Sequence, residues 1–266
     1  MQRLIVIAVI GFFAQFIDGT LGMGYGAFSA SLLIAGGLYP AIASATVHTA
    51  EVFTTFFSGG FHLWFGNVKK RWLLPLIIPG TIGGIAGAFL ITSIPGNITK
   101  PYIAGFLLFL GILVFYRFIP WRIAVPAGEA DPTNKGKSSR IANSPAKLPV
   151  LGFIAAFVDA VGGGGWGPIT TPGLILTENT EPSKVVGTVN LAEFFITIAI
   201  SATFIATIGW ESFRWDLVAA LIVGGIIAAP VAAYLCKKLP TKILGILVGL
   251  ALIGFNLRTL ILTVLD

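Results

Sequence analysis

Two short stretches of the sequence combine an aspartate, a cluster of glycines and an aromatic residue. They are IDGTLGMGYGAF, residues 17–28, and VDAVGGGGWGPI, residues 158–169. Glycine runs interrupt a helix, and the helix that follows begins with backbone N–H groups that have no partner within it. Such a helix start carries a partial positive charge and binds anions. Each stretch therefore predicts an anion-binding helix start, near residues 25–27 and 166–168.

The residue types in these stretches limit how an anion could be bound. Neither stretch contains lysine or arginine, so we expect backbone N–H groups to make most of the contacts. The expected substrate-binding residues are Gly22, Gly24, Tyr25, Gly26, Gly163, Gly164, Gly165, Trp166, Gly167, Thr46, His48, Thr188 and Asn190. An alternative role for the glycines is to let helices pack closely, although four consecutive glycines exceed what packing requires.

Four carboxylates accompany the glycine clusters. Glu51 and Glu193 lie about ten residues into long apolar segments, near the expected bilayer centre, where a carboxylate is costly and marks a functional position. Each could carry a proton that accompanies the anion, or accept hydrogen bonds that hold a glycine loop. Asp18 and Asp159 immediately precede the glycine turns and would repel an anion, so we expect them to fix the loops.

A metal site is not expected, and neither is a cofactor. His48 and Glu51 are three residues apart and share a helix face. The residue equivalent to His48 in the second half of the chain is Asn190, which is a poor ligand for transition metals. The single cysteine, Cys236, excludes an intrachain disulfide and a cysteine-based metal cluster.

The composition is that of a membrane protein. Of the 266 residues, 56% are hydrophobic and 11% are charged, against roughly 25% charged in ordinary soluble domains. The net charge of +6 arises from short basic runs between apolar segments, which is typical of cytoplasmic loops. Nucleic acid is therefore not an expected partner. The apolar N-terminus is interpreted as retained, because a counterpart recurs at residues 148–157.

The chain consists of two related halves. Residues 11–26 match residues 152–167, the string TVHTAE at 46–51 matches TVNLAE at 188–193, and Arg71-Trp72 matches Arg214-Trp215. The expected organisation is an N-terminal half (1–119), a polar cytoplasmic linker (120–147) and a C-terminal half (148–266).

The expected fold is an all-α polytopic membrane protein built from two inverted repeats. Apolar stretches long enough to cross a bilayer run over 41–63, 72–91, 101–119, 183–208, 215–235 and 243–264. Residues 4–36 and 148–176 are interrupted by glycines, and each forms either a re-entrant hairpin or a broken spanning helix. Re-entrant hairpins, with six full spans, place every strongly basic loop in the cytoplasm but put Arg3 outside. They invert the second half relative to the first, and we favour them over eight spans.

The paired Asp–glycine hairpins, the repeat and the length resemble the TauE/SafE family of membrane transporters, over nearly the whole chain except the linker. This resemblance implies transport of a small inorganic or organic sulfur-containing anion, such as sulfite, sulfate, thiosulfate or an organosulfonate, through the cell membrane. It determines neither the anion nor the direction, and it leaves a monomer and a homodimer as alternatives.

Other functions remain as alternatives to a transporter. A passive anion channel fits the same residues, and an accessory membrane protein would leave the glycine clusters unexplained. A membrane lipid pyrophosphatase-like enzyme shares inverted repeats and re-entrant hairpins, but it needs positive groups on the phosphates. The predicted membrane interior has no lysine or arginine except Arg258, towards one end, so an enzyme is not expected.

Overall fold

The chain folds into helices in a computed structural model that describes residues 2–119, 147–177, 180–238 and 241–265. The helices are α1 (Gln2–Leu21), α2 (Tyr25–Ala35), α3 (Pro40–Trp64), α4 (Leu73–Ser93), α5 (Gly96–Phe118), α6 (Lys147–Gly162), α7 (Trp166–Thr177), α8 (Pro182–Ile208), α9 (Trp215–Leu235) and α10 (Thr241–Leu265). Two 3-10 turns, Lys70–Trp72 and Trp210–Ser212, precede α4 and α9. No strand occurs within these ranges. The expected linker lies outside the described residues except for Lys147.

Six of the described helices are long and apolar enough to cross a membrane, namely α1, α4, α5, α8, α9 and α10. The sequence-based set contained α3 in place of α1. The glycine break comes late in the first hairpin, so that twenty uninterrupted residues precede it, about 30 Å of helix. Helix α3 has 25 residues, but its buried polar residues lower its hydropathy below that of the six.

The two helix breaks occur where the glycines predict them. Helix α2 begins at Tyr25 and α7 begins at Trp166, as expected. Gly22, Gly24 and Gly163 have φ angles of 66°, 126° and 71°. These lie in the left-handed region that glycine adopts without steric cost, so the glycines allow the chain to turn sharply between the paired helices.

Equivalent helices of the two halves run antiparallel to each other. In α5 and α10, Gly111 packs on Leu252 and Gly249 packs on Phe115. In α3 and α8, the His48 ring lies 6.1 Å from the Phe204 ring, and further along α3 Ser58 donates a hydrogen bond to Asn190. In both pairs, later residues of one helix contact earlier residues of the other, as antiparallel packing requires.

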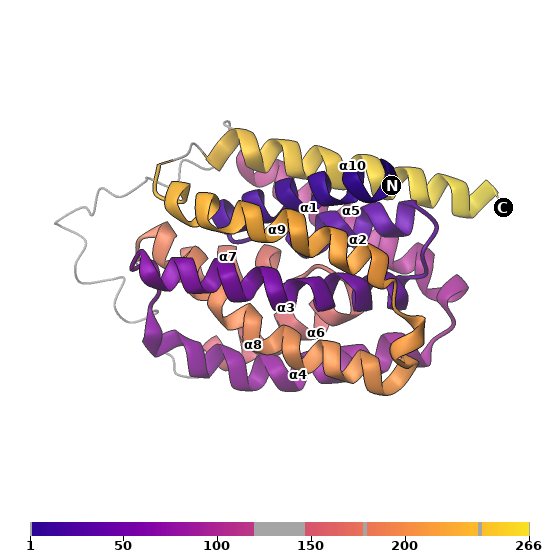
Figure 1. Ribbon diagram of the computed structural model, residues 1–266, viewed down its shortest axis with the longest axis horizontal. Coiled ribbons are helices and arrows are strands. Elements are labelled where there is room, and N and C mark those ends of the chain that lie inside the picture. Colours follow the sequence, from indigo (N-terminus) through magenta and orange to yellow (C-terminus); the bar gives the residue numbers. More distant parts are fainter. Residues whose placement is uncertain (1, 120–146, 178–179, 239–240, 266) are drawn as a thin grey trace.

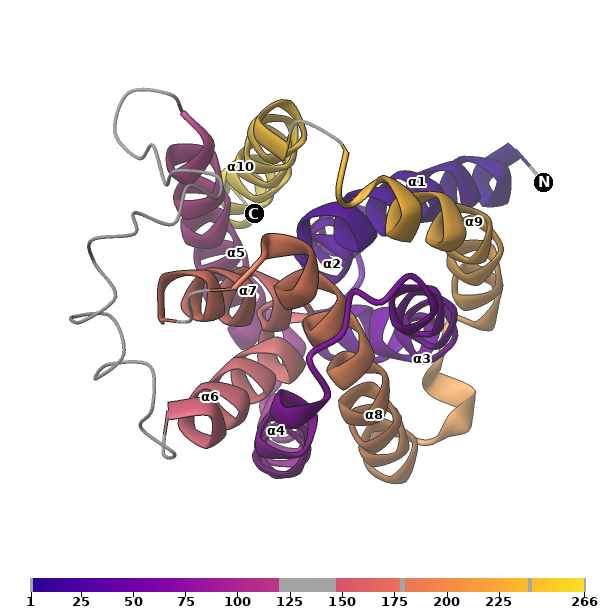
Figure 2. The same cartoon turned by 90° about the vertical axis from the view of Figure 1, so that its left-hand side faces the viewer.

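The first helix of each half packs in parallel against the fourth helix of the other half. Along α4 and α6, Gly83 and Gly87 pack on the backbone of Phe153 and Phe157. Helices α1 and α9 pack in the same way, and a Cβ on Gly224 would lie 1.9 Å from the Ala8 oxygen. Figure 2 shows the pairs α1/α9, α4/α6 and α5/α10 arranged around α2 and α7. This pattern is unchanged when the halves are exchanged, as a twofold axis perpendicular to the helices requires, and it supports the predicted inverted repeat.

The basic loops gather at one end of the molecule. Lys237 donates a hydrogen bond to the Phe65 carbonyl, and Lys184 donates one to the Gly66 carbonyl, so the residues just after α3, the start of α8 and the residues just after α9 lie together. The opposite end contains the contact of Arg258 with the Ala35 carbonyl and both chain termini (Figure 1). Basic residues mark the cytoplasmic side of membrane proteins.

Each glycine-interrupted hairpin begins and ends at the same end of the molecule. Because α1 is parallel to α9 and α3 is antiparallel to α8, the start of α1 and the end of α2 lie at the end opposite the basic loops (Figure 1). By the same relations, the start of α6 and the end of α7 lie at the basic end. This geometry fits re-entrant hairpins better than broken spanning helices.

Single cysteines at the two ends should be labelled from opposite sides of the membrane. In a Cys236→Ala background, we expect Lys70→Cys to react only with a reagent that enters the cytoplasm, and Glu211→Cys with an impermeant reagent added outside. Both native side chains are exposed. Labelling of both cysteines from one side would contradict the inverted arrangement and favour eight spans.

Candidate substrate and ion site

The tips of the two hairpins are in direct backbone contact. A Cβ on Gly164 would lie 2.0 Å from the Ala27 nitrogen, and one on Gly167 would lie 2.5 Å from the Met23 Cα atom. A Cβ on Gly26 would lie 2.9 Å from the Gly163 oxygen. The glycines therefore permit close packing as well as tight turns. In this conformation the loops themselves fill the space where we expected the anion.

Asp159 supports the second hairpin loop from within. Its Oδ1 atom accepts a hydrogen bond of 2.6 Å from the Gly165 N–H, and its backbone carbonyl accepts one of 2.7 Å from Gly163. The carboxylate thus satisfies a backbone donor just before α7 begins. Such a contact is what the expected loop-fixing role would involve, and the role itself stays a prediction.

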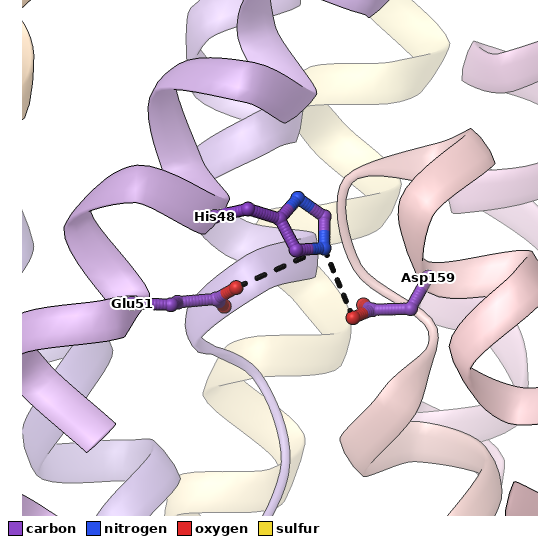
Figure 3. A group of neighbouring side chains, drawn as sticks. All are labelled: His48, Glu51 and Asp159. Atoms are coloured by element: carbon purple, nitrogen blue, oxygen red, sulfur yellow. Dashed lines mark hydrogen bonds and ion pairs between the residues drawn. The ribbon is translucent and has the colours of Figure 1, made fainter. Parts of the chain in front are cut away.

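The second carboxylate oxygen of Asp159 faces His48, which comes from the other half of the chain. His48 Nε2 lies 3.0 Å from Asp159 Oδ2 and 3.9 Å from Glu51 Oε2 (Figure 3). Asn190, the counterpart of His48, lies beside the carboxyl group of Asp18, which also faces the Tyr25 N–H. Each aspartate is therefore contacted by the third helix of the opposite half.

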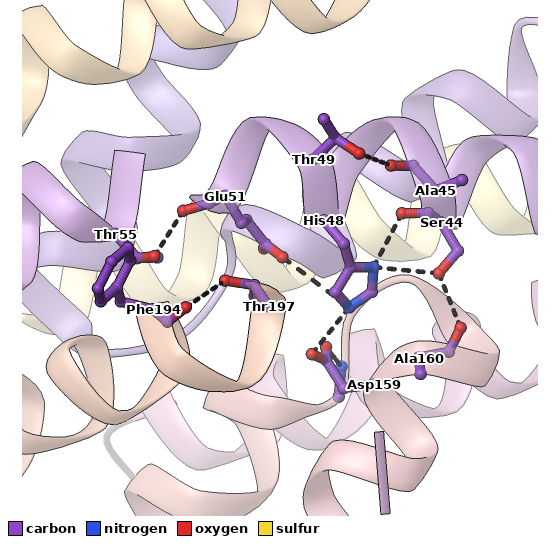
Figure 4. Close-up of polar contacts among 11 residues, drawn as sticks. Ser44, Ala45, His48, Thr49, Glu51, Thr55, Asp159, Ala160, Phe194 and Thr197 are labelled. Atoms are coloured by element: carbon purple, nitrogen blue, oxygen red, sulfur yellow. Dashed lines mark hydrogen bonds and ion pairs between the residues drawn. The ribbon is translucent and has the colours of Figure 1, made fainter. Parts of the chain in front are cut away.

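The hydrogen bonds of His48 determine where its protons can be. Its Nδ1 atom lies 2.8 Å from the Ser44 carbonyl, and the Ser44 hydroxyl donates to the Ala160 carbonyl (Figure 4). A carbonyl oxygen can only accept, so Nδ1 carries a hydrogen. The short contact between Nε2 and Asp159 then requires one more proton, on either the imidazole or the carboxyl group.

Glu51 is buried without a hydrogen-bonding partner. It is 1% exposed, and neither of its carboxylate oxygens has a partner. It lies against the start of α2, because a Cβ on Gly26 would be 3.0 Å from Oε1. An ionised carboxylate in such a place costs several kcal/mol unless a positive group compensates it. Unless a protonated His48, whose Nε2 lies 3.9 Å from Oε2, supplies that charge, Glu51 requires a proton of its own or a cation.

Four carboxylates come together at the hairpin tips, although they are far apart in the sequence. Asp18, Asp159 and Glu51 all act electrostatically on Glu193, which is 5% exposed. The buried polar residues among those the structure describes include histidines but no lysine or arginine. An anion could approach this cluster only if most of the carboxylates were neutralised.

Some expected site residues point elsewhere. The hydroxyl of Thr46 donates to its own helix at the Ile42 carbonyl. Thr188 donates to the Lys184 carbonyl and accepts from the Lys69 N–H, near the basic end. The Trp166 indole donates to the Val189 carbonyl. These three side chains hold helices and loops in place in this conformation.

Several polar residues near the site are not among those expected from the sequence. Gln15 and Thr54 are fully buried, and their polar atoms lack hydrogen-bonding partners. Both are three residues from a site carboxylate, Asp18 and Glu51, and this helical spacing could have identified them. The sequence also did not anticipate that ligand atoms of His48, Glu51 and Asp159 would lie within 4.8 Å of one another, because Asp159 is on the other half.

Adding a methyl group at the hairpin contact should destabilise the protein. We expect Gly164→Ala to lower the free energy of unfolding by about 1–3 kcal/mol, as overpacking does, because the new Cβ would overlap the Ala27 backbone. Gly60→Ala is the matched control. Gly164 lies in the loop between α6 and α7, whereas Gly60 is an exposed residue within α3. A Cβ on Gly60 meets nothing within 4 Å, and helix propensity favours alanine there by up to about 1 kcal/mol. Thermal unfolding in detergent would measure both, and equal midpoints would contradict the contact.

Two comparisons relate this chain to known proteins. The profile of the family described as sulfite exporter TauE/SafE matches residues 7–259. The chain is 48% identical over 261 residues to a protein from Bacillus subtilis (strain 168) named probable membrane transporter protein YtnM, covering 98% of this chain and 84% of the relative. No solved structure matches the chain.

Proposed function

Because the chain belongs to the sulfite exporter TauE/SafE family and is a multi-pass membrane transporter, we propose that its substrates are small sulfur-containing oxyanions. Sulfite, sulfate, thiosulfate and small organosulfonates are the candidates. The observation that carries the proposal is the meeting of two helix starts, α2 and α7, at glycines inside the bundle. Interrupted helices that meet within inverted repeats form the binding sites of many secondary transporters.

The binding groups would be backbone N–H groups of the first helical turns. Gly26 and Ala27 open α2, and Trp166 and Gly167 open α7, where N–H groups have no partner within the helix. Each helix start would contribute about 1–2 kcal/mol in a partly buried setting. Two converging starts would give weak binding, which suits a carrier that must release its substrate.

The anion would enter when the two hairpin tips separate. In the present conformation the tips touch through Gly164 and Ala27, so the path between them is closed. The tight pairs α1/α9 and α4/α6 are suited to move as rigid units, each carrying one hairpin. Relative rocking of these units would open the site towards one side at a time.

The carboxylate cluster suggests that anion binding is coupled to protons. Asp18, Glu51, Asp159 and Glu193 would repel an oxyanion if all were ionised, and the imidazole of His48 faces Asp159 and Glu51. We propose that Glu51 or Glu193 takes up the coupling proton, while Asp18 and Asp159 mainly support the loops. A carrier is favoured over a passive channel by the direct contact of the hairpin tips, which leaves no open path between them.

An enzymatic role is not proposed. A pyrophosphatase-like reaction needs cationic groups on its phosphates, and the buried residues that the structure describes include no lysine or arginine.

Flux measurements would test the substrate class. In proteoliposomes containing the purified protein, we expect uptake of at least one labelled anion among sulfite, sulfate and thiosulfate, with competition by unlabelled organosulfonates but not by chloride. Protein-free liposomes are the control. If none of these anions moves, the proposed substrate class is wrong.

Removing both ionisable glutamates would test proton coupling. Glutamine keeps the shape of glutamate and most hydrogen bonds but cannot release a proton. We expect a pH gradient to accelerate anion flux in the wild type but not in the Glu51→Gln/Glu193→Gln protein, which should still exchange anions slowly. Undiminished acceleration in the double variant would leave only the supporting role for these residues.

A further inference from the structure

We propose that a monovalent cation binds beside Glu51, in a site that exists only in the first half of the chain. The candidate ions are sodium and the hydrated proton, both of which bind oxygen ligands. The role of the site as a coupling site rests on the proposed transport function, but its existence does not.

The site is defined by buried polar atoms that have no hydrogen-bonding partner. They are both carboxylate oxygens of Glu51, Asp18 Oδ2, the Tyr25 hydroxyl, the Thr54 hydroxyl and the amide of Gln15. All five side chains are at most 2% exposed. Buried polar groups are normally satisfied by the protein, by water or by an ion, so this cluster marks a place where water or a bound ion would supply the missing partners.

These atoms come from α1, α2 and α3 and lie near one another. The Tyr25 hydroxyl lies beside the Thr54 side chain, close enough for the two hydroxyls to interact although not in hydrogen-bonding geometry, and it lies near the carboxylates of Glu51 and Asp18. A Cβ on Gly225 of α9 would lie 2.3 Å from Thr54 Cγ2 and 3.6 Å from Gln15 Cβ. Thr54 and Gln15 therefore both pack against this glycine of α9. Glycine at this position of α9 thus gives both side chains room to pack there.

The equivalent positions of the second half are apolar or already satisfied. Gln15 corresponds to Ala156, Thr54 to Ile196, and Tyr25 to Trp166. Ile196 packs directly on Gly80 of α4, where a Cβ would lie 2.6 Å from its Cδ1 atom. The Trp166 indole donates to a backbone carbonyl. In the second half, the positions equivalent to Gln15 and Thr54 therefore carry apolar side chains. In the first half, the same positions carry polar atoms without hydrogen-bonding partners.

The charges around Glu51 favour a cation. Asp18 on α1, Asp159 on α6 and Glu193 on α8 are carboxylates that act on the same region, and Tyr25 on α2 is neutral in its usual form. The buried basic groups among the described residues are both on α3: His48, 3.9 Å from Glu51, and His62, which lies against the Gly19 carbonyl. Helix α9 contributes no titratable group at this depth, since Asp216 and Tyr234 lie near its ends. A bound cation would compensate the buried carboxylates, which otherwise destabilise one another.

The ligand atoms favour a small monovalent ion over a divalent one. Carboxylate, hydroxyl and amide oxygens are hard ligands. Mg²⁺ keeps several waters in addition to its protein ligands, and Ca²⁺ takes six to eight oxygen ligands, so the six oxygen atoms of this cluster would reach only the lower limit for Ca²⁺. A cation at Glu51 would also lie beside the start of α2, where it would reduce repulsion of an incoming oxyanion.

Thermal unfolding of the purified full-length protein in detergent, without any sulfur anion, tests the site directly. Two arms separate the two ions: NaCl against choline chloride at constant pH, and acidification in choline chloride. A ligand that binds only the folded state raises the unfolding temperature. We expect the wild type to gain at least about 3 °C in one arm, a shift typical of a stabilisation near 1 kcal/mol in a protein of this size.

Matched variants locate the effect. We expect Glu51→Gln to lose the shift and Glu193→Gln to keep it, since Glu193 lacks the polar neighbours. Thr54→Val, which retains the side-chain volume, should reduce the shift by at least half. Thr203→Val is its control, because the Thr203 hydroxyl donates to the Ala199 carbonyl of its own helix. Thr54→Val also keeps the test decisive if Glu51→Gln does not fold.

Two results would overturn the proposal: no shift of the wild type in either arm, or equal loss of the shift in the Glu51 and Glu193 variants. A shift that depends on Glu51, together with no flux of sulfur anions, would keep the cation site and reject the proposed substrates. Flux without any shift would reject the cation site alone.

Discussion

The architecture depends on the backbone contact between two glycine loops inside the bundle. Because Gly164 lies against Ala27 and Gly167 against Met23, the starts of α2 and α7 can approach more closely than side chains would allow. The same contact brings Asp18 and Asp159, which flank the turns, near the third helices of the opposite halves. Larger residues at the tips would separate the carboxylates and the helix starts together.

This arrangement creates an electrostatic problem that explains much of the site. Partial positive charges of two helix starts favour an anion, but four carboxylates surround them and one imidazole faces two of these. The net balance changes sign with the number of protons or cations present. An anion site whose affinity depends on a second ion is the physical requirement for coupled transport, and the buried, unpartnered oxygen atoms of Glu51 are where that second ion would have the largest effect.

The two halves share a scaffold but differ in the chemistry that it carries. Both have the Asp–glycine turn, the glutamate and the parallel packing of their first helix on the other half's fourth helix. Only the first half adds His48, Tyr25 and Thr54, while the second half has Asn190, Trp166 and Ile196. Pseudosymmetry can therefore supply the geometry of alternating access, while the cation site that we propose would be confined to the first half by the asymmetry of its side chains.

The sequence by itself determined the class of protein, the duplication and the positions of the helix breaks. These features are local: apolar length, repeated strings, and glycine clusters that end α1 and α6 at the predicted places. It also identified Asp18, Glu51, Asp159 and Glu193 as candidate site residues, because a carboxylate within an apolar segment is conspicuous without any structure.

Only the tertiary structure decided which residues meet. The pairing of His48 with Asp159 joins residues 111 positions apart, and no periodicity within either half reveals it. The hydroxyls of Thr46 and Thr188 could have faced the site, but helix geometry gives each a carbonyl four residues earlier. Gln15 and Thr54 looked ordinary in the sequence, since a polar residue becomes significant only when the packing of α9 against α1 and α3 buries it without a partner. Local patterns fix where helices begin and end, but long-range packing fixes which polar atoms are left to bind a ligand.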